Sequence, residues 1–132
     1  MTNLKPRPIF EQAFYHDGRG PELQRAVWNH SGIILAGFEY FNPDDVYQPA
    51  NLKHLQLVRV EAYSMTGEEV HGNTCAIPDS KAAIWLIENS LWLPQFQQRH
   101  LSGCNHYQIM FYDEIYDVVC KEIIPWQRAA PS

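Results

Sequence analysis

Residues 82–124, AAIWLIENSLWLPQFQQRHLSGCNHYQIMFYDEIYDVVCKEII, contain the clearest alternating patterns of the chain. In residues 107–112, and again in 115–122, every second side chain belongs to one of two sets that would face opposite sides of a strand. The pair Asp113-Glu114 separates the two runs. A period of two is typical of a strand, and a short polar break between two such runs is typical of a turn. This stretch therefore predicts an antiparallel hairpin.

The run before this hairpin, AAIWLIEN at 82–89, is ambiguous by periodicity. A helix capped by Asp79 or Ser80 and a strand both fit the pattern, and the Ile and Trp residues favour the strand. Ser90 is then expected to cap a short helix over residues 91–100. Pro94 would lie in its first turn, where a missing amide N–H breaks no helical hydrogen bond.

The chain before residue 82 predicts further strands. Residues 22–41 are expected to form a hairpin, because turn-forming residues at 29–32 separate two apolar runs. Residues 54–65 predict one long strand, and residues 69–72 a short return strand.

Both ends of the chain are expected to be irregular. Prolines and turn-forming residues make residues 1–21 a tail, and Pro125 is expected to end the last strand and leave 125–132 as a second tail. With 132 residues, the chain predicts a single globular domain over 1–132. The expected fold class is α+β: mainly antiparallel sheet of about five to seven strands, curled or sandwiched, with one short helix near 91–100.

Composition narrows the classes of function. A formal net charge of −5 and ten scattered Lys and Arg residues do not predict a basic, nucleic-acid-binding face. No apolar run approaches the roughly 20 residues that span a bilayer, and the first ten residues, MTNLKPRPIF, do not resemble a signal peptide. Three cysteines, an odd number, suggest reduced thiols and a cytoplasmic protein.

The last third of the chain resembles a loose pattern in uncharacterised small bacterial proteins. The segments that carry the resemblance are ENSLWLPQF, HYQIMFYDE and YDVVCKE, within residues 88–122. Such proteins look structural or binding in character, and some resemble immunity proteins that occupy a toxin. The resemblance implies a non-enzymatic protein and brings no catalytic residues with it.

One constellation predicts a metal site as the alternative function. His71 and Cys75 share a His-x-x-x-Cys spacing with His100 and Cys104, and His106 follows the second pair. Zinc takes four Cys or His ligands, often as two close pairs from separate loops. A zinc-binding protein or a small metalloenzyme could use the two pairs as four ligands, or His106 in place of one of them, although mixed His/Cys pairs are an unusual pattern for zinc.

Candidates for catalysis are weaker. Cys104 beside His100 and His106 is the best local pairing of a nucleophile with a base. Cys120 is expected to pack as a small apolar residue, and Ser90 to serve as a helix cap. The common phosphate-binding, dinucleotide-binding, zinc-protease and serine-hydrolase motifs do not occur in the sequence.

Aromatic residues make up 13% of the chain and suggest a binding surface. Tyr and Trp bury a large area at interfaces with little loss of conformational entropy. Tyr112, Asp113, Glu114 and Tyr116 are expected to form an acidic, aromatic patch at the hairpin tip. The preferred hypothesis is a cytoplasmic, immunity-like domain that uses this patch to bind a basic protein such as a toxin; burial of an aromatic face in a homodimer is also possible.

Overall fold

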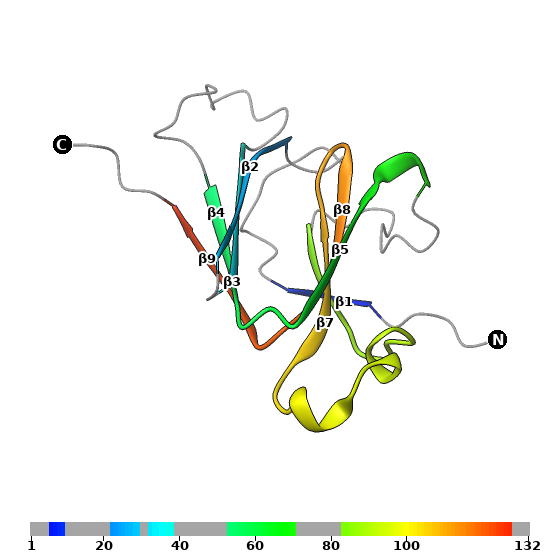
Figure 1. Ribbon diagram of the computed structural model, residues 1–132. Helices are drawn as coiled ribbons and strands as arrows, with labels where there is room; N and C mark the ends of the chain where they lie inside the picture. Colours follow the sequence, from blue (N-terminus) through cyan, green and yellow to red (C-terminus); the bar gives the residue numbers. More distant parts are fainter. Residues whose placement is uncertain (1–5, 10–21, 30–31, 39–52, 71–82, 128–132) are drawn as a thin grey trace.

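The computed structural model describes residues 6–9, 22–29, 32–38, 53–70 and 83–127. In this part of the chain, nine strands form two antiparallel sheets, and no α-helix is present (Figure 1). The expectation of a mainly antiparallel sheet is confirmed, the expected number of five to seven strands is too low, and the α+β class with one helix is not confirmed. None of the helical segments in the described ranges is long and apolar enough to span a membrane.

Sheet A contains five strands in the order β1-β6-β7-β8-β5, and sheet B contains four in the order β2-β3-β4-β9. The strands are β1 (Pro6–Ile9), β2 (Glu22–Asn29), β3 (Gly32–Phe38), β4 (Lys53–Val58), β5 (Ala62–Gly67), β6 (Ile84–Ile87), β7 (Asn105–Met110), β8 (Glu114–Cys120) and β9 (Glu122–Gln127). The predicted hairpins correspond to β2–β3 and β7–β8. The choice of a strand for AAIWLIEN is confirmed by β6.

One bent ribbon of two strands joins the sheets. Strand β4 pairs with β9 in sheet B, and the continuations of the same two strands, β5 and β8, pair in sheet A. Between the pairs Val58–Glu122 and Ala62–Val119, residues 59–61 lie opposite residues 120–121, so one strand carries an extra residue. Such a bulge bends a strand and lets it change sheets.

Backbone geometry at this corner explains why the predicted strand over 54–65 is interrupted. Arg59 has a φ of 55°, a left-handed conformation that a continuous strand does not contain. Pairing resumes on both sides of the bend, where the amide of Lys121 donates to the Val58 carbonyl and the amide of Glu61 donates to the Val119 carbonyl, each at 2.9 Å. The alternating pattern is present on both sides, but it does not reveal the bulge.

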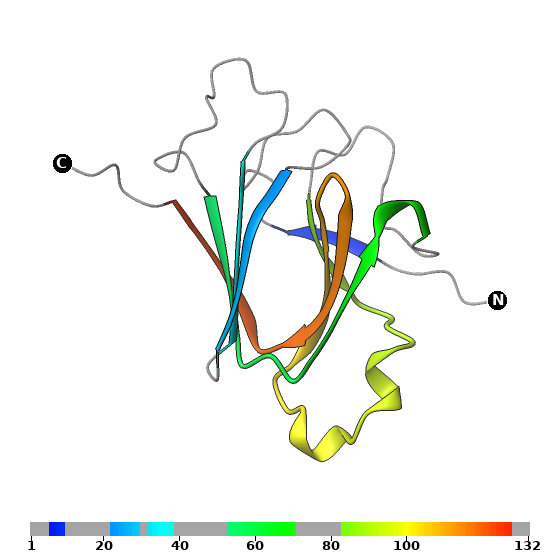
Figure 2. The same ribbon diagram turned by 45° about the horizontal axis from the view of Figure 1, so that its top comes forward.

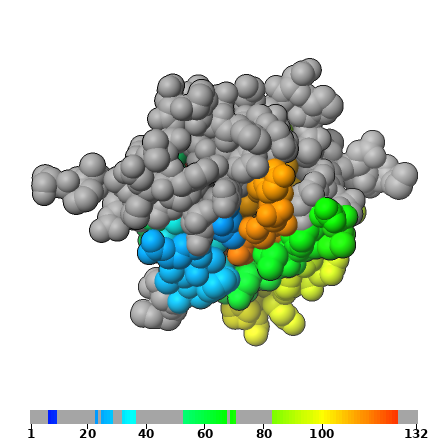
Figure 3. Space-filling model, turned by 90° about the horizontal axis from the view of Figure 1, so that it is seen from above, coloured from blue at the N-terminus to red at the C-terminus, as the bar shows by residue number. Residues whose placement is uncertain are grey.

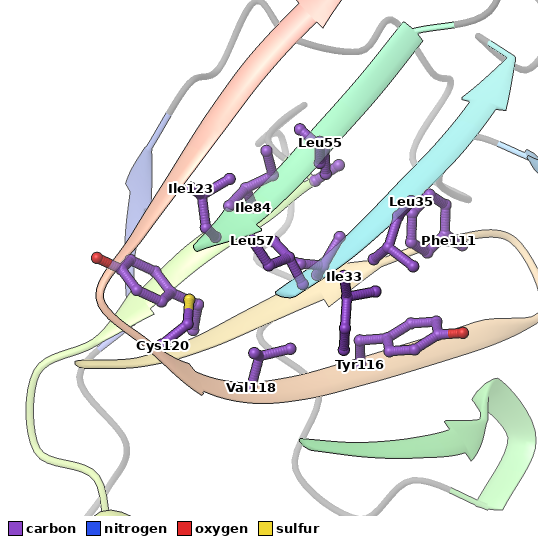
Figure 4. Close-up of a cluster of buried hydrophobic side chains, with 13 residues drawn as sticks. Ile33, Leu35, Leu55, Leu57, Ile84, Phe111, Tyr116, Val118, Cys120 and Ile123 are labelled. Atoms are coloured by element: carbon purple, nitrogen blue, oxygen red, sulfur yellow. The ribbon is translucent and has the colours of Figure 1, made fainter. Parts of the chain in front are cut away.

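The core lies between the two sheets. Figures 1 and 2 show the sheets meeting at the corner and opening away from it. Apolar side chains from both inner faces meet in this space, and Figure 4 shows several of them directed toward each other. Fully buried members include Leu35, Leu55 and Leu57 from sheet B, Ile109 and Val118 from sheet A, and Phe111 from the turn between β7 and β8. Complete burial of each such side chain contributes roughly 1.5–3 kcal/mol to folding.

Short 3-10 turns replace the helix expected at 91–100. They are η3 (Leu93–Gln95) and η4 (Gln98–His100). The side-chain amide of Gln98 donates to the carbonyls of Leu93 and Phe96, at 2.7 and 2.8 Å. These carbonyls would accept backbone amides in an α-helix, so the contacts stabilise the turns instead. The expected return strand at 69–72 is also wrong where it is described, because Glu68–Val70 forms the 3-10 turn η2.

Prolines occur within two edge strands, one in a segment expected to be an irregular tail and one at a position expected to end its strand. Pro6 and Pro8 belong to β1, which pairs with β6, and Pro125 belongs to β9, where it lies opposite Leu55. Both strands lie at the edges of their sheets. An edge strand tolerates proline because one side of it needs no ladder amide. The remaining tail residues, including 10–21, lie outside the described ranges.

Gly32 should be the least replaceable glycine of the described residues. Its φ is 152°, and a Cβ placed there would lie 2.0 Å from the carbonyl oxygen of Leu57. We expect Gly32→Ala to lower the free energy of unfolding by roughly 3 kcal/mol or more, because the backbone of β3 must move away from β4. Urea denaturation followed by tryptophan fluorescence would measure the change.

Gly103→Ala is the matched control. Gly103 also has a positive φ, of 80°, but no atom would lie within 4 Å of an added Cβ. It should therefore lose only about 1–2 kcal/mol from the unfavourable backbone conformation. Equal losses for the two variants would contradict the close approach of β3 and β4.

Candidate functional site

The tip of the β7–β8 hairpin does not present the whole patch expected from the sequence. The Phe111 amide donates to the Glu114 carbonyl at 2.8 Å and closes the turn. Asp113 is exposed, and Tyr112 and Glu114 are half-buried. Tyr116 is only 3% exposed, in an edge-to-face contact with Phe111. It belongs to the core because it lies on the inner face of β8, so it cannot contribute to a surface patch.

The residues of the metal hypothesis are only partly described. His71 and Cys75 lie outside the described residues, so the four-ligand site is not tested as a whole. Among the residues that the structure does describe, no group of three or more His, Cys, Asp or Glu side chains could hold a metal ion. His100 accepts a hydrogen bond from Arg99 at 3.0 Å, and both ring nitrogens of His106 contact other side chains.

A cluster of exposed apolar residues lies where the edges of the two sheets approach each other. Trp28 on β2 is 49% exposed, and Tyr63 and Met65 on β5 are 48% and 54% exposed. The rings of Trp28 and Tyr63 lie 6.0 Å apart between centroids. Figure 3 shows β2 and β5 next to each other on this surface. These three residues are called the edge patch below.

A second site is a chain of hydrogen bonds on the other face of sheet A. The Oγ of Ser90 lies 2.7 Å from Nδ1 of His106, and Nε2 of His106 lies 2.8 Å from Oδ1 of Asp117. Gln108 also donates to Oδ1 of Asp117, at 3.2 Å. His106 and Gln108 are buried, at 7% and 2% exposure, and Trp92 packs edge-to-face on the His106 ring.

Strand geometry brings these side chains together. His106 and Gln108 share the outward face of β7, because side chains two residues apart point the same way. Gln108 lies directly opposite Asp117 on β8, and His106 is the diagonal neighbour of Asp117. Ser90 lies in the segment after β6, where its Oγ accepts the amide of Leu93, the first residue of η3, at 2.9 Å. The N-cap position of η3 is Trp92, and the helix that Ser90 was expected to cap is not formed, so that prediction is not confirmed.

A pocket of about 480 Å³ adjoins this chain of hydrogen bonds. Both Ser90 and His106 line it. Its other lining residues come from the end of β6, the start of β7 and the segment between them: Leu86, Ile87, Glu88, Asn89, Leu93, Pro94, Gln98 and Asn105. The volume lies in the range of small-molecule sites in proteins.

Two cysteines of the described residues, Cys104 and Cys120, have free thiols. Cys120 is buried in the core, as expected from the sequence, and burial raises its pKa from 9.0 to about 12. Burial also raises the pKa of the Cys104 thiol, which opposes a role as a thiolate nucleophile. Cys75 lies outside the described residues.

The raised pKa of Cys120 predicts a loss of stability in alkali. The folded protein keeps this proton up to about pH 12, whereas the unfolded thiol releases it above about pH 9. Stability is therefore retained below pH 9 and falls by about 1.4 kcal/mol per pH unit as the pH rises further. Tyr107 and Tyr116, whose pKa values burial also raises, should add to the loss at higher pH.

Urea denaturation at pH 8, 9, 10 and 11 would measure this slope. In Cys120→Ala the free energy of unfolding should fall less steeply between pH 9 and 10 than in the wild type, because about one proton fewer is released on unfolding. This difference in slope does not depend on the stability of the variant at pH 8. An unchanged slope would mean that the Cys120 thiol ionises equally in the folded and unfolded protein.

Comparison of the chain with protein-family models, curated proteins and solved structures found no match. The resemblance of the last third to small immunity-like bacterial proteins therefore stays a prediction.

Proposed function

We propose that this domain binds another protein through the edge patch of Trp28, Tyr63 and Met65. The observation that supports the proposal is that all three residues lie on the inner faces of their sheets and yet remain about half exposed. Inner-face side chains of a sandwich are normally covered by the opposite sheet. A partner segment would supply the missing cover.

Their positions opposite core residues make this argument specific. Trp28 pairs with Ile33, Tyr63 with Val118 and Met65 with Tyr116, and each of these partners is at most 3% exposed. The apolar core thus continues to the surface at strands β2 and β5. Both are edge strands, and an edge strand can add an extended segment of a partner by main-chain hydrogen bonds.

The partner is proposed to be a protein with a basic surface. The chain has a net charge of −5, and opposite charge speeds the encounter of two proteins. Exposed Asp113 on the β7–β8 hairpin can contribute to this attraction. An immunity-like role, in which the domain occupies a toxic protein, is the form of this function that the resemblance implies.

Trp28→Ser is the variant that tests the patch. Tagged protein purified from its own host would be examined by native mass spectrometry. We expect a stoichiometric second protein on the wild type and at least about 30-fold weaker retention on Trp28→Ser, since a central Trp commonly supplies 2 kcal/mol or more. Met65→Ser should weaken retention in the same direction.

Leu91→Ser provides the control. Leu91 is 61% exposed and follows β6, which β7 and β8 separate from β5 in sheet A. This variant should retain the partner fully. A wild type without any partner, or a partner retained equally by Trp28→Ser, would contradict the proposal. A dimer of identical chains that Trp28→Ser dissociates would identify the patch as a self-association surface instead.

A further inference from the structure

We propose that Ser90, His106 and Asp117 form a hydrolytic site, in which Ser90 attacks the carbonyl carbon of a small carboxylic ester. The site is independent of the edge patch, because it lies on the outward face of sheet A. It rests on two observations together: the continuous chain of hydrogen bonds from Ser90 to Asp117, and the pocket onto which Ser90 and His106 both open.

The hydrogen bonds assign the protons of a ready nucleophile. An ionised Asp117 carboxylate can only accept, so the proton of a neutral His106 ring belongs on Nε2, which donates to Oδ1. Nδ1 then carries a lone pair and accepts the hydroxyl proton of Ser90. The Leu93 amide donates to the Ser90 Oγ and occupies one of its acceptor positions, so the hydroxyl proton is still available to donate to His106.

Two further contacts fix the imidazole and the carboxylate. Gln108 donates to the same oxygen of Asp117 that accepts from His106, and Trp92 packs on the imidazole ring. Asp117 is thus a positioning residue: it selects the tautomer of His106 and stabilises the imidazolium that forms during reaction. In the more common triad of serine, histidine and aspartate, Nε2 of the histidine faces the serine and Nδ1 faces the carboxylate. Here Nδ1 faces Ser90 and Nε2 faces Asp117, so the two nitrogens exchange roles while the order serine, histidine, carboxylate is kept.

The reaction balances with water as the second reactant. The Ser90 Oγ forms a bond to the carbonyl carbon as its proton passes to Nδ1 of His106. His106 then protonates the departing alkoxide, which leaves as an alcohol, and an acyl-Ser90 ester remains. Water attacks this ester with His106 again as the base. The products are one carboxylic acid, one alcohol and the free enzyme.

The pocket indicates the class of ester. Leu86, Ile87, Leu93 and Pro94 provide apolar walls, and Glu88 provides a carboxylate. Glu88 also pairs with Arg7 at 3.1 Å, in a contact that is largely exposed to water. A neutral ester with a short apolar acyl group fits this lining, whereas an anionic acyl group would approach Glu88 with like charge.

A fluorophosphonate with a short alkyl chain is the probe that tests the site. It is neutral, and it phosphonylates a serine whose hydroxyl is activated by a base, with loss of fluoride. The native wild-type protein would be treated at neutral pH and digested, and the labelled peptide would be identified by mass spectrometry. We expect labelling at Ser90. Ser102 is an internal control, because it is exposed in the segment that follows η4.

Variants separate a catalytic role from a structural one. His106→Asn should slow labelling of Ser90 by about 100-fold or more, because the base is lost. Asp117→Asn should slow it in the same direction, and hydrolysis of a nitrophenyl ester of a short fatty acid should fall in parallel. Thermal unfolding of each variant would show that it remains folded under the conditions of labelling.

The wild-type experiment needs no variant and is decisive by itself. An unlabelled Ser90, or equal labelling of Ser90 and Ser102, would overturn the proposal and leave the three residues as an anchor for the segment between β6 and β7. Labelling of Ser90 at an unchanged rate in a folded His106→Asn protein would overturn the assignment of His106 as the base.

Discussion

The antiparallel pairing of two chain segments that continues from one sheet into the other, on both sides of a bulge, is the constraint on which this structure depends. Strands β4 and β9 on one side of the corner, and β5 and β8 on the other, are the same two chain segments. The bulge at Arg59 sets the bend between them, and every other strand belongs either to sheet A or to sheet B. The space between the two sheets becomes the core, and core side chains reach the surface at two of the sheet edges, β2 and β5.

Local sequence predicted much of this structure because most pairings are between neighbours. Alternation along 107–122 and the turn residues at 29–32 identify both hairpins, and Ile and Trp identify β6. The bulge at Arg59 could not be predicted, because a single left-handed residue leaves the pattern of apolar residues nearly unchanged. Strand structure at Pro8 and Pro125 could not be predicted either, since the tolerance for proline depends on a strand's place in the sheet and not on its sequence.

The candidate sites show a similar division. The sequence predicts Ser90 as the cap of a helix that the structure does not contain, and it predicts His106 as a metal ligand or as a base beside Cys104. Asp117 was missed because its contact with His106 depends on hairpin register. A turn centred on Asp113-Glu114 would place other residues opposite Asp117, whereas the observed pairing places Gln108 there. The predicted surface position of Tyr116 is wrong because the turn ends at Glu114 and Tyr116 shares the inner face of β8 with Val118.

The ribbon also has a consequence for how the chain reaches this structure. Its two strands pair Gly67 with Glu114 and Lys53 with Gln127, partners that lie roughly 50 to 70 positions apart along the chain. Closing these long loops costs conformational entropy before the contacts within either sheet can compensate for that cost. The β2–β3 and β7–β8 hairpins can form early and locally. The corner forms only when the segment of β4 and β5 pairs with the distant segment of β8 and β9. Folding is therefore expected to be slow for a chain of this size, with the alternating, aromatic strands exposed to other chains in the meantime.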